Sequence, residues 1–185
     1  MDISSVILIG PIRTGKSTLA QKLAEDLELP RRSLDDLRWQ YYTEIGFDPS
    51  YSNSLAEAKL QERRRYWSKH DPHAIERFLA DYGRNHVLDF GGSHSLHEDE
   101  SQLQQVQTLL HDFPNVVLVL PMADVEESLA ILNERRGGPH MLYGFDLNRL
   151  MLEHPSNYTL ARHIIYTHGK SVAEASLELR QRLDL

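Results

Sequence analysis

The sequence predicts a single α/β domain in which helices enclose a five-stranded parallel sheet. Two observations support this fold class. Short runs of β-branched and other apolar residues alternate with longer amphipathic stretches, which is typical of strand–helix–strand units. A glycine-containing segment at residues 10–17 also joins the first apolar run directly to the first amphipathic stretch. With 185 residues, of which 41% are hydrophobic, the chain is long enough to bury one core.

Four strands are predicted where apolar residues follow one another without helical spacing, and Arg31-Arg32-Ser33-Leu34 is expected to form at most a short second strand. Together the five cover residues 6–9, 31–34, 86–89, 115–120 and 163–166, and the run Asn-Val-Val-Leu-Val-Leu at 115–120 is the clearest. Helices are predicted at 16–27, 55–67, 73–82, 98–111, 124–134, 147–153 and 171–183. The helices lie between the strands, so the chain can form parallel strand pairs with helical crossovers.

The ends of these helices carry recognisable signals. In the first helix Leu19, Leu23 and Leu27 recur at helical spacing. The helix at 124–134 has an acidic first turn, which suits the helix dipole. Ser171 is a suitable N-cap for the last helix, and Pro155 ends the one before it. Residues 41–54 are expected to form a polar connection.

Residues 10–17 fit the pattern G-x-x-x-x-G-K-[ST] completely. The two glycines permit backbone turns that other residues avoid, so that successive N–H groups can point at one anion. The following helix adds its positive end, the lysine can reach the β- and γ-phosphates, and the serine hydroxyl can bind Mg²⁺. The sequence therefore predicts an ATP site formed by Gly10, Arg13, Thr14, Gly15, Lys16, Ser17 and Thr18.

Asp35 and Asp36 follow the second predicted strand, at the sheet edge where the phosphates would lie. A carboxylate there could accept a proton from an acceptor hydroxyl or hold Mg²⁺ through water. The alternative is an exposed helix N-terminus, where aspartate is common. We predict a catalytic role for both, with Asp36 also contacting the acceptor and Asp35 also near the metal.

Asp89 ends the third predicted strand in the manner of a Walker B acid, and we expect it to share Mg²⁺ with Ser17. Alternatively, Asp89 only caps the turn that follows. Gly91 and Gly92 allow the backbone to approach an acceptor closely, and His94 follows as a candidate acceptor contact. The histidines of the chain do not have the spacing of a known zinc motif.

Residues 135–150 are predicted to form a small mobile lid on the single domain of residues 1–185. Gly137, Gly138 and Pro139 interrupt this segment, a composition that favours a loop over a packed element. Arg135 and Arg136 lie at its entry, where a lid that closes over a transferring phosphoryl group needs cations. We therefore predict that both arginines are catalytic.

The order of these features resembles the shikimate kinase branch of the nucleoside-monophosphate-kinase-like proteins, which share this phosphate-binding loop (P-loop). The acidic motif after the second strand is similar to residues 35–36, the glycine turn to residues 91–93, and the lid entry to residues 135–138. An arginine beside an acid on the next helix is similar to residues 62–65, which suggests Arg64 as an acceptor ligand. The adenine-contacting loop resembles residues 167–170 and suggests that Lys170 contacts ATP. The resemblance implies the P-loop NTPase fold and phosphoryl transfer from ATP to a small acceptor.

Two departures from the family pattern concern the substrate. Residues 139–148 contain no arginine, although the family's lid carries one, and His154 stands where the family has a second arginine. Those cations bind an anionic substrate, so we expect an acceptor other than shikimate. The alternatives are a nucleoside or nucleotide kinase, with Trp39, Tyr41 or Tyr42 stacking on a base, and a regulatory ATP-binding protein with weak ATPase activity.

The net charge of −7 argues against non-specific binding to nucleic acids, which requires an excess of lysine and arginine. The chain has no cysteine, and its longest apolar run is too short to cross a bilayer. We expect a cytoplasmic protein that does not bind membranes, is a monomer or a homodimer, and has ATP, Mg²⁺ and a small acceptor as its ligands.

Overall fold

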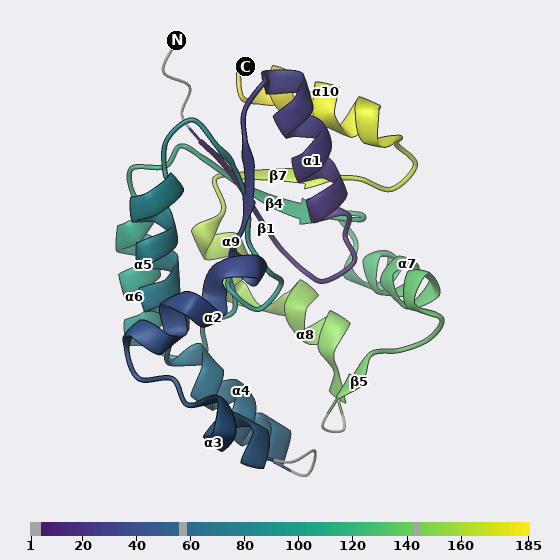
Figure 1. The fold of residues 1–185 in the computed structure, drawn as a ribbon. Helices are drawn as coiled ribbons and strands as arrows, with labels where there is room; N and C mark the ends of the chain where they lie inside the picture. The colour runs from purple at the N-terminus through teal and green to yellow at the C-terminus, as the bar shows by residue number, and fades with distance from the viewer. Residues whose placement is uncertain (1–4, 56–58, 143–144) are drawn as a thin grey trace.

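The computed structural model describes residues 5–55, 59–142 and 145–185. Its main sheet has five parallel strands in the order β2-β3-β1-β4-β7, of which Figure 1 labels β1, β4 and β7. These strands are β1 (Val6–Ile9), β2 (Arg31–Ser33), β3 (Val87–Asp89), β4 (Asn115–Leu120) and β7 (His163–Tyr166). The predicted five-stranded parallel sheet between helices is confirmed.

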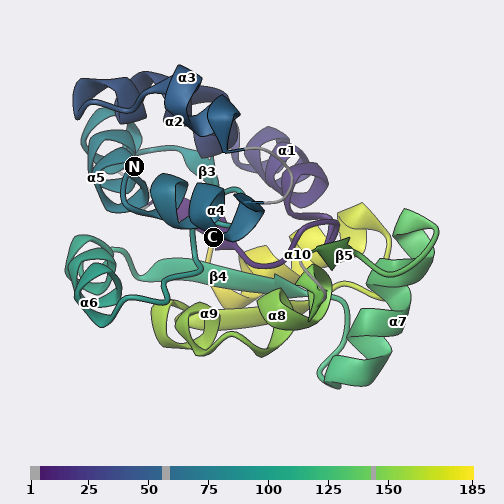
Figure 2. The same ribbon diagram turned by 90° about the horizontal axis from the view of Figure 1, so that it is seen from below.

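Ten helices are present in the described part of the chain. They are α1 (Lys16–Leu27), α2 (Leu34–Glu44), α3 (Pro49–Ser54), α4 (Leu60–Ser68), α5 (Asp71–Tyr82), α6 (Glu100–Leu109), α7 (Val125–Arg136), α8 (Leu147–Glu153), α9 (Pro155–Leu160) and α10 (Val172–Arg182). In Figures 1 and 2, α1 and α10 lie side by side on one face of the sheet, and α5 and α6 lie next to each other on the opposite side.

The strands separate two apolar layers because successive side chains point to opposite faces. Val6 and Leu8 of β1 join the layer formed with α1 and α10, whereas Ile7 and Ile9 join the larger layer formed with α2, α5, α6 and α9. All four β1 side chains are completely buried. The central strand is therefore apolar throughout, as expected for a parallel strand that is covered on both faces.

The register of the strands determines where the site can form. Leu8 of β1 and Ser33 of β2 both pair with Asp89 of β3, so these three strands end together. The loops after β1 and β3 begin at Gly10 and Phe90, and helix α2 follows β2 directly at Leu34, so these three segments meet at one edge of the sheet. This edge holds the predicted phosphate-binding loop and the predicted acids.

The structure corrects the prediction that residues 41–54 form a polar connection. Residues 34–44 are helix α2 and residues 49–54 are helix α3. Tyr41 and Tyr42 are buried in the core. Their rings form the apolar face of α2, whereas leucine and alanine side chains form the apolar face of α1. Asp48 caps α3 through the N–H of Ser50.

Two further predicted helices differ from those observed. The predicted helix at 55–67 is observed as α4, which begins at Leu60, and residues 56–58 lie outside the described residues. Pro155 does not only end a helix, because it also occupies the first turn of a new one, α9. Proline is tolerated there since the first N–H groups of a helix have no helical partner.

The segment predicted as an irregular lid loop is more ordered. Arg135 and Arg136 form the last turn of α7, which ends at Gly137 with a left-handed φ of 84°. Strands β5 (Met141–Leu142) and β6 (Phe145–Asp146) then pair as a short antiparallel hairpin. Gly144 lies outside the described residues. The prediction of a loop is wrong for the hairpin strands, and the predicted mobility of the segment stays a prediction.

Candidate active site

Residues 10–17 lead from the end of β1 into the first turn of α1. Gly10 and Gly15 have φ values of 126° and 93°, which favour glycine, and Arg13 also has a positive φ of 67°. A Cβ atom on Gly10 would lie only 2.8 Å from the carbonyl oxygen of Val119. Thr14 is buried and donates a 3.1 Å hydrogen bond to the carbonyl oxygen of Pro11. These contacts hold the loop in the form that the sequence pattern predicts.

Lys16 lies inside this loop. Its side chain is 6% exposed, and Nζ donates a 2.8 Å hydrogen bond to the carbonyl oxygen of Pro11. Burial lowers the pKa of Lys16 to about 8, while the nearby carboxylates of Asp89 and Asp35 act in the opposite direction. An anion in the loop would favour the charged form of this amine, and phosphate binding by the loop stays a prediction. Ser17 and Thr18 are exposed at the start of α1.

Asp35 and Asp36 occupy the first turn of α2, so they lie at a helix N-terminus and also beside the loop. Asp35 fits against the glycine turn, because a Cβ atom on Gly91 would lie 2.3 Å from its Oδ1. Partial burial raises the pKa of Asp35. Asp36 is exposed and forms no hydrogen bond or ion pair with the described residues. The structure thus places Asp35 against the glycine turn, and the role of Asp36 stays a prediction.

Arg38 is a site residue that the sequence did not reveal. Its Nη1 lies 3.2 Å from Oδ1 of Asp35, one turn earlier in α2, and its guanidinium stacks 4.5 Å from the ring centre of Trp39. Its Nε is buried without a hydrogen-bond partner. The three-residue spacing from Asp35 would have indicated this pair if residues 34–44 had been expected to be helical.

Asp89 is buried at the end of β3, as a Walker B acid would be, and it has a partner that the sequence did not reveal. Nη2 of Arg31, on β2, lies 2.6 Å from Oδ2 of Asp89. The in-register pairing of β2 with β3 explains this contact, since Arg31 begins the neighbouring strand. The charge of Asp89 is therefore shared between Arg31 and Lys16.

The two glycines of the turn after β3 have different neighbours. Gly91 adjoins Asp35, whereas a Cβ atom on Gly92 would lie 2.8 Å from Cγ1 of Ile12 in the P-loop. The predicted acceptor contact of His94 needs correction, because the ring is completely buried. His94 lies behind Asp35 rather than at the open surface, with Nδ1 4.0 Å from Oδ1 of that residue.

Of the three arginines predicted to belong to the site, only Arg135 contacts the P-loop in the part of the chain that the structure describes. Arg64 forms an ion pair with Glu98, so its partner is not an acid of the site. Arg135 does reach the P-loop: its Nη1 donates to the carbonyl oxygen of Arg13 at 3.0 Å, and Arg13 returns a 3.1 Å bond to the carbonyl oxygen of Arg135. Arg136 instead bonds the carbonyl oxygen of Pro139 in its own turn.

The loop after β7 is tied to the P-loop from the other side. Thr167 Oγ1 donates a 3.2 Å hydrogen bond to the carbonyl oxygen of Thr14. Lys170 bonds the carbonyl oxygen of Tyr166 at 2.9 Å and pairs with Glu178 of α10. Thr167 therefore connects this loop to the phosphate site, and the contact of Lys170 with ATP stays a prediction.

The rings considered for base stacking are mostly inaccessible. Tyr41 and Tyr42 are each 1% exposed. Trp39 is 40% exposed, but the guanidinium of Arg38 lies over its ring. The structure thus assigns the two tyrosines to the core.

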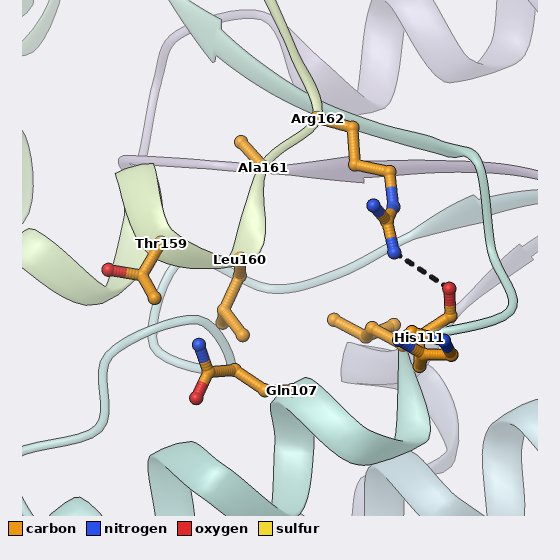
Figure 3. A pocket seen from close by; sticks show the side chains of 7 residues that line it. Gln107, His111, Thr159, Leu160, Ala161 and Arg162 are labelled. Carbon is orange, nitrogen blue, oxygen red and sulfur yellow. Dashed lines mark hydrogen bonds between the residues drawn. The ribbon is translucent and has the colours of Figure 1, made fainter.

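Other features of the chain lie away from this edge. Among the described residues, no group of three or more His, Asp or Glu side chains could hold a metal ion, and no helix there is long and apolar enough to span a membrane. A pocket between α6 and the start of β7 (Figure 3) is at the opposite end of the strands and includes none of the predicted site residues. Its lining residues are Gln107, Leu110, His111, Thr159, Leu160, Ala161 and Arg162.

No protein-family model matches the sequence, and no curated protein matches it either. Solved structures with the same fold were found. A shikimate kinase from Acinetobacter baumannii, in complex with shikimate, has a TM-score of 0.64 at 16% identity over 98% of this chain and 94% of its own. A shikimate kinase from Bacteroides thetaiotaomicron has a TM-score of 0.56 at 19% identity over 98% and 99%. A gluconokinase from Sinorhizobium meliloti 1021 has a TM-score of 0.51 at 17% identity over 97% and 93%.

These similarities extend over nearly the whole chain, while the sequence identities are low. The chain has the fold of these P-loop kinases, so the resemblance predicted from the sequence is confirmed at the level of the fold. A common fold can carry different reactions, so the activity must be argued from the site.

Proposed function

We propose that this chain transfers the γ-phosphoryl group of ATP to a hydroxyl group of a small polar molecule. The observation that carries the proposal is the placement of Asp35. This carboxylate lies against Gly91 and close enough to Lys16 for their charges to interact, and its side chain is 51% exposed. A kinase needs a base beside the phosphate-binding loop to accept the proton of the acceptor hydroxyl. A protein that only binds ATP does not need such a base.

The site residues have distinct roles in this reaction. Asp35 accepts the proton of the acceptor hydroxyl while the oxygen of that hydroxyl forms a bond to the γ-phosphorus. The bond between the γ-phosphorus and the ADP oxygen breaks in the same step. Lys16 neutralises charge on the β- and γ-phosphates, and Arg135 does so from the lid side. Arg135 already contacts the backbone of Arg13, so it need move little to reach a bound phosphate.

The residues present fit a magnesium ion bound together with the nucleotide. Mg²⁺ prefers oxygen ligands and keeps several waters, so it needs few protein groups. Ser17 offers an exposed hydroxyl at the start of α1, and Asp89 offers a carboxylate through water. When bound, the ion would neutralise charge on the phosphates. Asp35 is then left to the acceptor.

The surroundings of Asp35 favour a hydroxylated acceptor over a nucleoside. The two tyrosines considered for base stacking are buried, and the ring of Trp39 is covered by Arg38. Arg38 also places a cation beside this carboxylate, with Nη1 3.2 Å from Oδ1 of Asp35. The neighbours described above include shikimate kinases and a gluconokinase, whose named substrates are small hydroxylated molecules. We propose that this acceptor is a sugar, a cyclitol or a sugar acid other than shikimate.

An acceptor screen tests the proposal. Purified protein is incubated with Mg²⁺-ATP and panels of sugars, cyclitols, sugar acids and nucleosides, and the products are analysed by mass spectrometry. We expect one class of hydroxylated acceptor to gain 80 mass units, the mass of a transferred PO₃H group. The variant Lys16→Ala controls for contaminating kinases and should give no product. ATP binding without a phosphorylated product from any panel would favour the regulatory alternative, and a nucleoside product would favour the nucleoside kinase.

A further inference from the structure

His94 has a completely buried ring whose two nitrogens have no hydrogen-bond partner among the described residues. Buried polar atoms are rarely left unpaired, because each one costs about 1–3 kcal/mol. The ring lies between two carboxylates on different helices. Its Nδ1 is 4.0 Å from Oδ1 of Asp35 on α2, and its Nε2 is 3.7 Å from Oδ1 of Asp71 on α5.

The two carboxylates differ in how firmly they are held. Asp71 is 3% exposed, and the hydroxyl of Tyr42 donates a hydrogen bond to its Oδ1. Asp35 is half exposed at the open edge of the sheet and has the P-loop beside it. The ring of His94 thus lies between a carboxylate held in the core and a carboxylate at the open edge of the sheet.

The backbone holds His94 in this position. The N–H of His94 donates a 3.0 Å hydrogen bond to the carbonyl oxygen of Gly91, which closes a tight turn after β3. Gly91 is also the residue against which the Asp35 carboxylate fits. The turn after β3 therefore places both the backbone of Gly91 and the imidazole of His94 next to the Asp35 carboxylate.

We propose that His94 is a positioning residue for Asp35, with Asp71 holding the ring, so that His94 Nδ1–H donates to Asp35 when the acceptor binds. This inference rests on the proposed function for its catalytic consequence. The separation of 4.0 Å must shorten by about 1 Å to become a hydrogen bond, and catalytic hydrogen bonds often tighten in this way when substrate binds. One oxygen of Asp35 is then fixed by His94, and the other is free for the acceptor hydroxyl.

The protonation of Asp71 supports this tautomer. Burial raises the pKa of Asp71 to about 7 and lowers the pKa of His94, so both groups favour their neutral forms in mildly acidic solution. A protonated Asp71 can donate to Nε2, which leaves the ring hydrogen on Nδ1, the nitrogen nearer Asp35. The other charged or titratable groups around the ring are Lys16 from α1, Arg38 from α2 and His97 from the same loop.

Three variants test the proposal by activity. His94→Asn retains an amide near the position of Nδ1, whereas His94→Leu retains only volume. His97→Gln is the matched control, because His97 is also buried and forms no ion pair with a described carboxylate, and glutamine keeps a polar group toward the backbone of His94. We expect His94→Leu to lower kcat for acceptor phosphorylation about 10- to 100-fold with the KM for ATP unchanged, and His94→Asn to recover most of it. His97→Gln should stay within about twofold of wild type.

The proposal is overturned if His94→Leu retains the wild-type kcat, or if His94→Asn loses as much activity as His94→Leu.

A second measurement needs neither turnover nor a stable variant at position 94. Nitrogen-15 NMR of histidine-labelled wild-type protein at pH 6 should show the ring hydrogen of His94 on Nδ1, and finding it on Nε2 would overturn the proposal. If Nδ1 carries the hydrogen but no acceptor is phosphorylated, the proposed function fails and the arrangement of the ring stands.

Discussion

At Gly91 a Cβ atom would lie 2.3 Å from Oδ1 and 2.5 Å from Oδ2 of Asp35. The carboxylate of Asp35 thus occupies this position only because residue 91 has no side chain. The Asp35 side chain can rotate away, so the fold can accommodate a methyl group at residue 91. Such a rotation would move the carboxylate out of its present position.

We predict that Gly91→Ala abolishes most phosphoryl transfer without unfolding the protein. The free energy of unfolding should change by about 1 kcal/mol or less, since φ of Gly91 is not in the left-handed region. The Kd for ATP, measured by calorimetry, should be unchanged. Gly92→Ala is the contrasting variant: its methyl group would meet Ile12 of the P-loop, so ATP binding should weaken. Equal effects of the two variants on ATP affinity would contradict this assignment.

The burial of Lys16 makes a prediction about pH. Its pKa of about 8 means that the amine loses its charge as the pH rises through that value, whereas an exposed lysine keeps it to above 10. We therefore expect ATP affinity to fall between pH 7 and about 9.5, with proton uptake on binding in this range. Titration calorimetry in buffers of different ionisation enthalpy measures that uptake. ATP affinity that does not change across this range would contradict a role for the Lys16 charge in binding.

At the scale of helices and strands, the C-terminal turn of α7 is joined to the P-loop. Arg135 and Arg13 exchange bonds between guanidinium and backbone carbonyl at 3.0 and 3.1 Å. The neighbouring Arg136 only closes its own turn through Pro139. Both arginines are exposed and lie in the last turn of α7, so their alanine variants can be compared directly.

We predict that Arg135→Ala lowers kcat at least about tenfold, because the variant removes a cation next to the transferring phosphoryl group. Arg136→Ala should have little effect on kcat. Steady-state kinetics of the two purified variants, with thermal unfolding as a check on the fold, distinguishes these outcomes. An equal loss in both variants would indicate that the charge of the lid entry matters and that the contact with Arg13 does not.

The elements that could be predicted from the sequence are those with aliphatic periodicity. Strands β1 and β4 are uninterrupted apolar runs, and α1 has leucines at helical spacing, so both kinds of element were found. Helix α2 was missed because its buried residues include Tyr41 and Tyr42, which also suit strands and binding surfaces. Missing α2 also meant missing Arg38, whose pairing with Asp35 depends on the helical turn between them.

The parts of the site that depend on contacts between distant segments could not be predicted. The P-loop is a local motif and was complete in the sequence. The pairing of Arg31 with Asp89 follows from the register of two strands, and the position of His94 follows from the packing of α5 against the turn after β3. No spacing along the chain specifies either contact. The sequence predicts that Asp36 contacts the acceptor and that Asp35 lies near the metal, whereas in the structure Asp35 is the residue that fits against Gly91.

For the whole molecule, the acids buried near the site make stability depend on pH. The pKa of Asp71 is raised to about 7, above the ordinary value of 3.8, mainly by burial. Below about pH 4 this residue is protonated in both the folded and the unfolded state. Between pH 4 and 7 the unfolded state releases the proton and the folded state keeps it, so the contribution of Asp71 to stability falls as the pH rises.

We predict that wild type loses stability relative to Asp71→Asn over this interval, by up to about 4 kcal/mol. The asparagine can still accept the hydrogen bond from Tyr42 but carries no charge. Urea unfolding of both proteins at pH 5, 6, 7 and 8 gives the difference directly. A difference that is independent of pH would contradict the burial of an ionisable Asp71.

We propose that Asp35, held beside Lys16 at the end of the sheet, makes this fold a phosphotransferase. The most direct measurement compares Asp35→Asn with Asp36→Asn for transfer of the γ-phosphoryl group from labelled ATP to the acceptor found by screening. We predict a loss of about 10²-fold or more in kcat for Asp35→Asn, with ATP affinity retained, and transfer near the wild-type rate for Asp36→Asn. Transfer by Asp35→Asn at the wild-type rate, or labelled phosphate released only to water by the wild-type protein, would contradict the claim.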